Sequence, residues 1–372
     1  MKEMFGDKHN FNKYVETKGG YVFKPRPVFG EYSLYSSESI FRQKLLALAQ
    51  GVGIDLSNLP EVEFKSPNID KVSLEVNKIF QIKYEALDSG LSRENLESIG
   101  ATISILTWLG VVDLHDDNIL FGRSDRGDFI FAPVDLECIF FGDDFLGRDL
   151  LPSHSFNCGC ETEYCMKFGL SSVFKHILRY NDKKELSRKI IPSILKGFES
   201  FSKVLFAKKD ELKADLFRGV RVESLISRVI LLNTGKYMRY LEGNEIEEVL
   251  LEEERVQLRR GDIPYFFKFY NDDRVYYWSS KNKYKDIKNH SVLGSRTKQD
   301  YTKLWHENLE KNFENMFVLL IIFLDMYPDK NYKVQLEDSL VLYKARGLIL
   351  FNRGIRYCYK RTPFKLGIKL NT

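Results

Sequence analysis

One stretch, residues 111–138, constrains this chain more than any other: VVDLHDDNILFGRSDRGDFIFAPVDLEC. Its two apolar segments begin at Ile119 and Phe129 and are separated by the polar sequence GRSDRGD. Short apolar runs joined by a polar turn that contains Gly, Ser and Asp are typical of a hairpin. We therefore expect a polar loop, a hairpin whose second strand is buried, and a second polar loop.

Acidic and amide side chains lie directly before and after this hairpin. Asp113, His115 and Asn118 precede the first strand, and Asp135 and Glu137 follow the second. Kinases hold Mg–ATP with a loop that ends in Asn, followed by a strand that ends in Asp. In that arrangement the first Asp positions the nucleophilic hydroxyl, while the Asn and the second Asp bind the metal. The alternative is a polar turn whose Asp and Asn side chains merely cap the hairpin.

The composition allows a large core and gives no sign of export. The chain has 372 residues, of which 44% are hydrophobic, so we expect two lobes or domains. The net charge of +4 neither demands nor excludes nucleic acid, and we predict no such partner. The N-terminus lacks an apolar signal core, and the longest apolar run, residues 317–324, is too short to span a bilayer. We predict a reducing, cytoplasmic setting and no transmembrane segment.

Four side chains with soft or nitrogen ligand atoms cluster in the sequence HSFNCGCETEYC: His154, Cys158, Cys160 and Cys165. Structural zinc sites usually pair two knuckles, and the C-x-C-x4-C spacing fits them poorly. Five cysteines in the whole chain do not make a disulfide scaffold either. Ordinary thiols are the preferred interpretation, and metal binding stays open.

Hydrophobic periodicity predicts β structure near the N-terminus and mostly helices after the hairpin. Strands are expected at residues 12–16 and 21–24, the second ending at Lys24 before Pro25. Helical patterns cover residues 36–51, 71–87, 96–109, 173–178, 190–201, 222–240 and 313–324. Residues 282–298 predict a mobile loop, and residues 347–361 predict a hairpin.

Separated segments carry a resemblance to a known family. They are FGDKHN at residues 5–10, YVFKPRP at 21–27, DLHDDN at 113–118, APVDLE at 132–137, RVILLNTGKY at 228–237 and RGDIPYF at 260–266. In this order they resemble the dehydratase domain of class II lanthipeptide synthetases, the LanM family. That family shows a GD-x-H loop, a YKPR strand, a DLH-x-x-N loop, an IDLE strand, an R-x-x-x-R-x-T-x-x-Y helix and a GDIPYF segment. The joint match in one order is more specific than any single motif.

The resemblance implies an α+β, bilobal fold like that of protein and lipid kinases, with a mostly helical C-lobe and helical additions. Residues 1–108 would form the N-lobe on the nucleotide-phosphate side. Residues 109–372 would form the C-lobe, with the catalytic loop, the metal-binding strand and a helical elimination region. The implied reaction uses ATP and Mg²⁺ to phosphorylate Ser and Thr of a ribosomal precursor peptide, made of a leader and a Ser/Thr-rich core. Elimination of the phosphate then gives dehydroalanine or dehydrobutyrine.

The resemblance also implies roles for nine residues: nucleotide binding by Lys24, Asp7 and Glu137, magnesium binding by Asn118 and Asp135, phosphoryl transfer by Asp113 and His115, and elimination by Arg228 and Thr234. Loss of a phosphate needs a cation on the leaving group and a base for the Cα proton, which agrees with the additional Arg and Thr.

The chain departs from the family in several places. Leu232 stands where the family has a second Arg, and the hairpin between Asn118 and Asp135 is longer. The family's large region before the GD-x-H loop and its cyclase domain have no counterpart, so we expect no thioether ring formation by this chain. A separate cyclase or another modifying enzyme would then be a partner. Two alternatives stay open: a kinase that stops at the phosphorylated product, and a catalytically dead kinase-like binding module.

Overall fold

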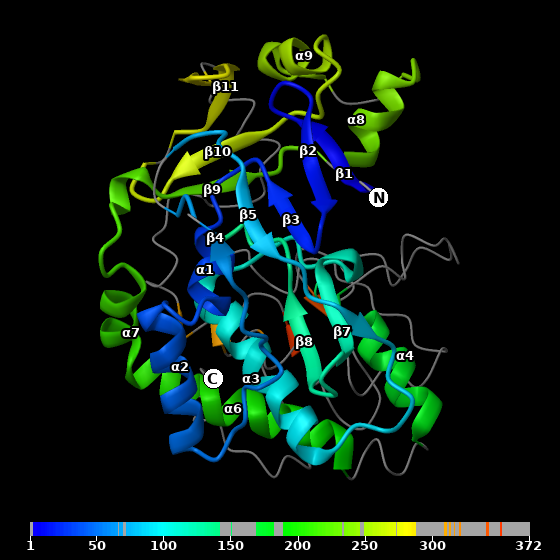
Figure 1. The fold of residues 1–372 in the computed structure, drawn as a ribbon, viewed down its shortest axis with the longest axis vertical. Helices are drawn as coiled ribbons and strands as arrows, with labels where there is room; N and C mark the ends of the chain where they lie inside the picture. Colours follow the sequence, from blue (N-terminus) through cyan, green and yellow to red (C-terminus); the bar gives the residue numbers. More distant parts are fainter. Residues whose placement is uncertain are drawn as a thin grey trace.

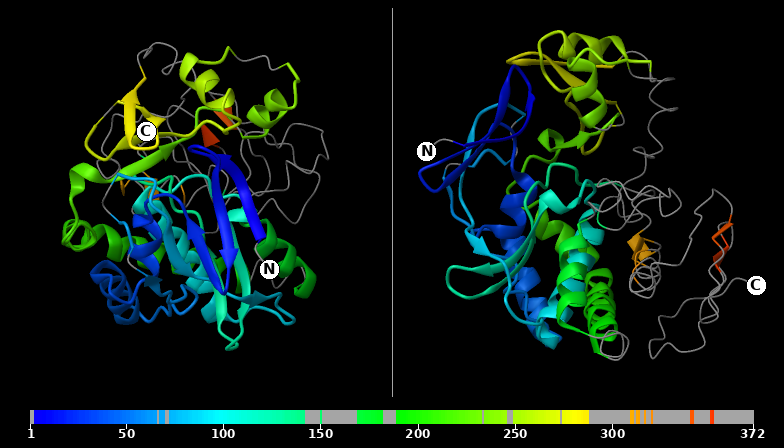
Figure 2. Two further views of the ribbon diagram at one scale, coloured as in Figure 1. Left: turned by 45° about the horizontal axis from the view of Figure 1, so that its top comes forward. Right: turned by 90° about the vertical axis from the view of Figure 1, so that its right-hand side faces the viewer.

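The computed structural model describes residues 3–65, 67–69, 72–141, 150, 169–181, 189–232, 234–245, 249–272 and 274–287, with isolated parts of 309–351. Within these residues the fold is α+β, built from antiparallel sheets of five, four and three strands and from α-helices (Figures 1 and 2). None of the helices in these ranges is long and apolar enough to cross a membrane.

The N-terminal sheet has the strand order β1-β2-β3-β5-β4. Its strands are β1 (Glu3–His9), β2 (Lys13–Lys18), β3 (Tyr21–Lys24), β4 (Phe64–Lys65) and β5 (Asn77–Phe80). The two strands predicted before Pro25 are thus confirmed. The helix predicted over residues 71–87 is wrong, because β5 and β6 (Tyr84–Glu85) form there. In β5 the buried Asn77 and Ile79 alternate with the more exposed Lys78 and Phe80, which is the period of a strand.

Two helices, packed against one another, lie below this sheet in the view of Figure 1. The first, α1 (Phe29–Tyr35), begins two residues after Pro27 and was not predicted. The second, α2 (Ile40–Gly51), confirms the helical pattern, although it begins later than residue 36. Ser39 caps it, since its side chain accepts a hydrogen bond from the Arg42 N–H.

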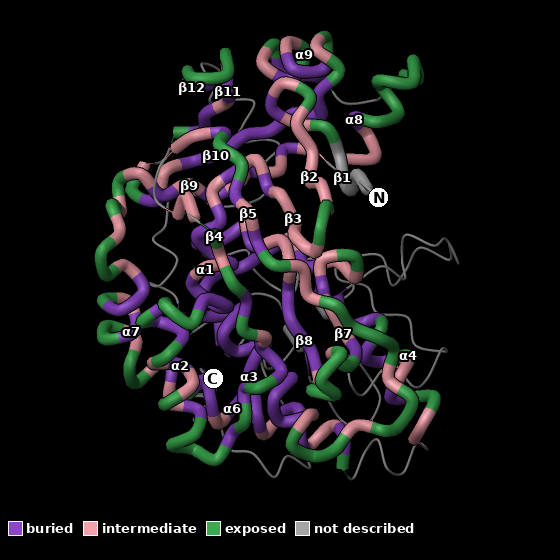
Figure 3. Tube along the Cα trace, in the orientation of Figure 1, coloured by how far each residue is buried: buried purple, intermediate pink, exposed green. Residues whose placement is uncertain are grey.

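The main core surrounds α3 (Arg93–Leu109), which is buried along most of its length (Figure 3). It packs against α6 (Ile191–Ala207), and α4 (Ser171–Tyr180) and α7 (Lys209–Leu216) complete this helical half. A Cβ atom at Gly197 of α6 would collide with the backbone of Glu97 in α3. Glycine therefore lets the two backbones approach closely near the N-terminal end of α3.

The hairpin predicted from the sequence is confirmed as β7 (Ile119–Ser124) and β8 (Phe129–Pro133). Ile119 lies opposite Pro133, so the loop before the hairpin and the loop after it meet at one end. A short 3-10 turn, Asp116–Asn118, leads into β7. The two-residue strand β6 pairs with the outer edge of β7.

A four-stranded sheet, in the order β12-β11-β10-β9, lies at the same end of the molecule as the tip of the β1–β2 hairpin (Figure 2). Its strands are β9 (Ile226–Val229), β10 (Phe266–Phe269), β11 (Tyr276–Ser280) and β12 (Lys283–Asp286), accompanied by α8 (Thr234–Leu241) and α9 (Glu252–Leu258). The helix predicted over residues 222–240 is wrong in its first half. The β-branched Ile226 and Val229 pair with β10 instead, and a helix begins only at Thr234.

Part of the polar loop predicted at residues 282–298 is the strand β12, and its remainder from residue 288 lies outside the described residues. Of the predicted C-terminal hairpin, β14 (Leu350–Phe351) is described, and it pairs with the upstream β13 (Leu340–Val341). The sequence IRYCYKR and the cluster of His154 and three cysteines also lie outside the described residues. The division into lobes at residue 108 stays a prediction.

Candidate functional site

A cavity of about 1230 Å³ separates the N-terminal sheet from the loops at the end of the β7–β8 hairpin. Eight of the nine residues singled out in the sequence line it: Lys24, Asp113, His115, Asn118, Asp135, Glu137, Arg228 and Thr234. The ninth, Asp7, belongs to β1, and its side chain lies outside what the structure describes. Segments more than two hundred residues apart in the chain therefore contribute to one site.

The loop before the hairpin is held in a single shape. Asp113 adopts a left-handed backbone conformation, with φ of 64°, which Asp tolerates better than most residues. The Asn118 side chain donates a 2.8 Å hydrogen bond to the Asp113 carbonyl and lies 3.1 Å from His115 Nε2. The Val134 N–H donates to the Asn118 carbonyl, which fixes the loop beside Asp135.

Lys24 meets two carboxylates at the end of β3. Its Nζ lies 2.9 Å from Glu31 Oε1 and 3.1 Å from Asp135 Oδ1. Arg26 pairs with the same two carboxylates, at 2.6 Å from Glu31. Burial raises the pKa of Asp135, but the adjacent Arg26 and Lys24 outweigh burial and hold that pKa well below its ordinary value. The Asp135 carboxylate is therefore ionised and faces the cavity.

Sequence reasoning missed Glu31 and Arg26. Glu31 lies on α1, whose seven residues carry no helical periodicity that could be distinguished from the neighbouring loop. Arg26 follows Pro25 in the KPRP sequence. The signal that could have revealed it is a second cation, two residues after Lys24, at the end of an apolar strand. A buried guanidinium requires carboxylate partners, and Glu31 supplies one of them.

Glu137 joins Arg26 to Arg228. Its Oε2 lies 3.1 Å from Arg26 Nε and accepts a hydrogen bond from the Tyr265 hydroxyl, while its Oε1 lies 2.5 Å from Arg228 Nη1. The Arg228 N–H also donates to the Glu137 carbonyl at 2.8 Å. These contacts orient Arg228 toward the cavity, whereas nucleotide binding by Glu137 stays a prediction.

His9, at the end of β1, is a further cavity residue to which the sequence gave no role. Its Nδ1 lies 2.8 Å from the Ile263 carbonyl, so Nδ1 carries the proton and Nε2 is an acceptor, 3.5 Å from Arg228 Nη2. Burial and the charge of Arg228 lower the pKa of His9 to about 3. The ring is thus neutral near pH 7 and presents a lone pair beside a guanidinium.

Arg228 and Thr234 reach the cavity from different elements. Arg228 projects from β9, and Thr234 is the first residue of α8. On one continuous helix these side chains would face different directions, because six residues correspond to about 600° of rotation. The break between β9 and α8 brings both to the same cavity.

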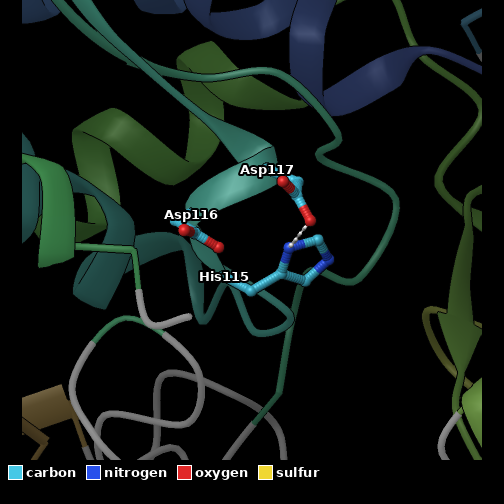
Figure 4. Close-up of side chains that lie close together, drawn as sticks. All are labelled: His115, Asp116 and Asp117. Atoms are coloured by element: carbon cyan, nitrogen blue, oxygen red, sulfur yellow. Dashed lines mark ion pairs between the residues drawn. The ribbon is translucent and has the colours of Figure 1, made fainter. Parts of the chain in front are cut away.

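His115, Asp116 and Asp117 place potential metal-ligand atoms within 4.8 Å of one another. Figure 4 shows Asp117 turned toward the imidazole, where its Oδ2 lies 3.7 Å from His115 Nδ1. Asp117 is exposed, and exposed acidic groups of this kind are common without an ion. Magnesium binding by Asn118 and Asp135 stays a prediction.

No protein-family model matches this chain, and no curated protein matches it. Its function has to be inferred from the residues of the cavity and their geometry.

The approach of α1 to the Asp135 loop gives a first prediction. A Cβ atom at Gly30 would lie 2.5 Å from the Leu136 carbonyl oxygen, so Gly30→Ala should push α1 away and separate Glu31 from Lys24. We expect a loss of roughly 1–3 kcal/mol in the free energy of unfolding, measured by urea denaturation.

The control is Gly51→Ala, at the end of α2, where an added Cβ meets nothing within 4 Å. That variant should gain stability through its helix propensity. Equal stabilities for the two variants would contradict the tight packing of α1 on residue 136.

Proposed function

We propose that this chain is an ATP-dependent peptide dehydratase with a kinase-like, bilobal fold. It would phosphorylate Ser and Thr of a precursor peptide and eliminate the phosphate in the same cavity. One observation carries the proposal: the Lys24–Glu31 ion pair and the Asp135 carboxylate face the same cavity as Arg228 and His9. Phosphoryl transfer needs the Lys24–Glu31 pair and the Asp135 carboxylate. Elimination of the phosphate needs a further cation, which Arg228 beside His9 supplies.

The order of elements supports the kinase part. Kinases place a Lys on the third strand of an antiparallel sheet and pair it with a Glu of the following helix. Lys24 ends β3, and Glu31 lies on α1. A kinase catalytic loop of the form D-L-x-x-x-N then precedes a metal-binding Asp. Asp113 to Asn118 has this form, and Asp135 follows the hairpin.

The donor atoms fit a magnesium ion bound with ATP. The Asn118 amide nitrogen is used by Asp113 and His115, which leaves its Oδ1 as the atom available to a cation. Asp135 Oδ1 pairs with Lys24 and Arg26, so Oδ2 is the oxygen that could bind a cation. Such hard oxygen ligands suit Mg²⁺, which would neutralise charge on the phosphates. The adenine ring of ATP would lie against an apolar wall of the cavity, formed by Val22, Ile79 and Leu120.

Phosphoryl transfer would use the residues nearest Lys24. The Asp113 carboxylate accepts the proton of the substrate hydroxyl, whose oxygen then forms a bond to the γ-phosphorus as the bond to the β-phosphate oxygen breaks. Lys24 holds the phosphate oxygens in place by charge. ADP and a phosphorylated Ser or Thr result.

Elimination would use the neighbouring residues. A base removes the Cα proton, the electron pair forms the Cα–Cβ double bond, and the Cβ–O bond breaks to release phosphate. Arg228 stabilises the negative charge of the leaving group, and the neutral His9 Nε2 accepts from the guanidinium and holds it in place. The 3.5 Å distance between His9 Nε2 and Arg228 Nη2 keeps this cation on the elimination side of the cavity.

A direct test is to incubate the protein with Mg–ATP and a Ser/Thr-rich precursor peptide and to follow the peptide mass. Loss of one water for each modified residue is expected. A gain of phosphate without loss of water would identify a kinase, and nucleotide binding without any mass change would identify a binding module.

A kinase that stops at the phosphorylated product is the second candidate. Leu232, at the position of the family's second Arg, packs against the apolar cluster of Tyr237, Leu250, Leu258 and Ile263. It does not line the cavity, so the site has one cation fewer for the leaving phosphate. The mass experiment distinguishes the two candidates.

A further inference from the structure

The turn between β1 and β2 has an unusual backbone. Asn10, Phe11 and Asn12 all have positive φ, at 48°, 70° and 59°. Asn tolerates the left-handed region, but a bulky residue such as Phe disfavours it, and three such residues in succession are rarer still. A conformation of this kind persists only where the surrounding structure stabilises it, and such strain is typical of functional sites.

The stabilising group is Asp262, whose side chain is fully buried. Its Oδ2 accepts a 2.9 Å hydrogen bond from the Phe11 N–H, and its Oδ1 accepts a 2.7 Å hydrogen bond from the Asn12 N–H. Successive backbone N–H groups of a turn form a concave site for an anion, and here the anion is a carboxylate of the same chain.

The segment around Asp262 adds further contacts to the turn. The Ile263 N–H donates a hydrogen bond to the Lys8 carbonyl at 2.7 Å. The Ile263 carbonyl accepts one from Nδ1 of the His9 imidazole. The Arg260 guanidinium lies 4.1 Å from the centre of the Phe11 ring and 3.2 Å from Asp262. The residues on both sides of His9 are therefore attached to residues 260–263, which are distant in sequence.

This attachment changes what the hairpin can do. In protein kinases a glycine-rich loop at this place covers the ATP phosphates. The turn here contains no Gly, and Asp262 already occupies two of its N–H groups. Opening it for a phosphate would leave a buried carboxylate without its hydrogen bonds, which is costly.

We propose that Asp262 is a positioning residue that clamps the β1–β2 turn and thereby holds His9 against Arg228, on the elimination side of the cavity. The turn then acts as a fixed wall rather than as a phosphate lid. The role for elimination rests on the proposed function, whereas the clamp itself does not.

Asp262→Asn tests the assignment, because it keeps the shape and removes the charge. Elimination is measured on a synthetic phosphoserine peptide with Mg–ADP, and the KM for ATP is measured in the phosphorylation step. We expect elimination to fall about a hundredfold, as for a catalytic group displaced by about 1 Å, and the KM for ATP to stay unchanged. A raised KM with unchanged elimination would overturn the proposal, since the turn would then bind nucleotide.

Two comparisons separate positioning from a general loss of structure. Asp215→Asn removes another buried carboxylate, which lies on α7 and pairs with Arg218. This variant should leave elimination unchanged. In the Asp262→Asn background, Phe11→Gly removes the steric cost of the left-handed backbone and should restore part of the elimination rate. Failure of this rescue, with a folded double variant, would contradict the clamp.

Hydrogen exchange tests the clamp without any activity. The amides of Phe11 and Asn12 should be protected in the wild type and should exchange at least about tenfold faster in Asp262→Asn. Unchanged exchange would refute the clamp. The two results can also differ. If the wild type does not eliminate phosphate, but Asp262→Asn still makes these amides exchange faster, the clamp holds while the proposed function and the catalytic part of this inference are refuted.

Discussion

Asp135→Asn should reduce phosphorylation of the peptide about 10²- to 10³-fold, since one electrostatic stabiliser of a transition state contributes a factor of this order. Phosphate elimination should fail with it when the reaction starts from unmodified peptide. The carboxylate is ionised beside Lys24 and Arg26, and its second oxygen would hold magnesium in the proposed site. An amide keeps the shape but lacks the negative charge that attracts the metal.

The fold should survive this change. The Asp135 side chain is 29% exposed, and Glu31 still pairs with both cations. We expect a loss of roughly 1–3 kcal/mol in unfolding free energy, with a cooperative thermal transition. Asp272→Asn is the matched control, because Asp272 is 24% exposed and pairs with Arg274 away from the cavity. Near-normal turnover of Asp135→Asn would contradict the magnesium assignment.

The central stretch could be predicted because its information is local. Alternating apolar segments and a polar turn specify the hairpin, and antiparallel pairing brings its two ends together. Asn118 and Asp135 therefore had to lie close to one another. Lys24 was predictable as the end of an apolar strand before Pro25, although nothing local indicated that it would meet Asp135.

The errors arose where tertiary contacts decide the structure. Residues 226–229 carry apolar side chains that also fit a helix, and it is pairing with β10 that makes them a strand. The same reason explains β5, which pairs with β3 on one side and β4 on the other. Helical periodicity over such short segments does not distinguish the two outcomes.

Arg26 and Asp262 could not be found from the sequence because each acts through a partner distant in the chain. Glu31 pairs with Lys24 and Arg26 nearby, but it lies on a helix that no sequence pattern predicted. Asp262 bonds to the turn at residues 10–12, and Arg26 bonds to Glu137. A carboxylate or guanidinium in a linear sequence is most often exposed to solvent. Only the fold reveals that these charges are buried and paired.

Arg228→Ala should separate the two halves of the reaction: the peptide becomes phosphorylated, and the phosphopeptide accumulates. Loss of a preorganised cation at the leaving group should slow elimination about 10²- to 10³-fold. Phosphorylation should continue, because Lys24 and Asp135 keep their contacts with each other and with Glu31. The ratio of phosphopeptide to dehydrated peptide, measured by mass spectrometry, reports this change even when less protein is folded.

That ratio also distinguishes catalysis from stability. Arg228 is buried and pairs with Glu137, so its removal costs stability as well, although Glu137 keeps Arg26 and the Tyr265 hydroxyl. Arg42→Ala removes another buried guanidinium, which bonds to the Leu59 carbonyl and does not line the cavity. It should lower stability and total product but leave the ratio unchanged. If Arg228→Ala dehydrates the peptide fully, or cannot phosphorylate it at all, Arg228 does not serve elimination specifically, and the assignment of this residue is wrong.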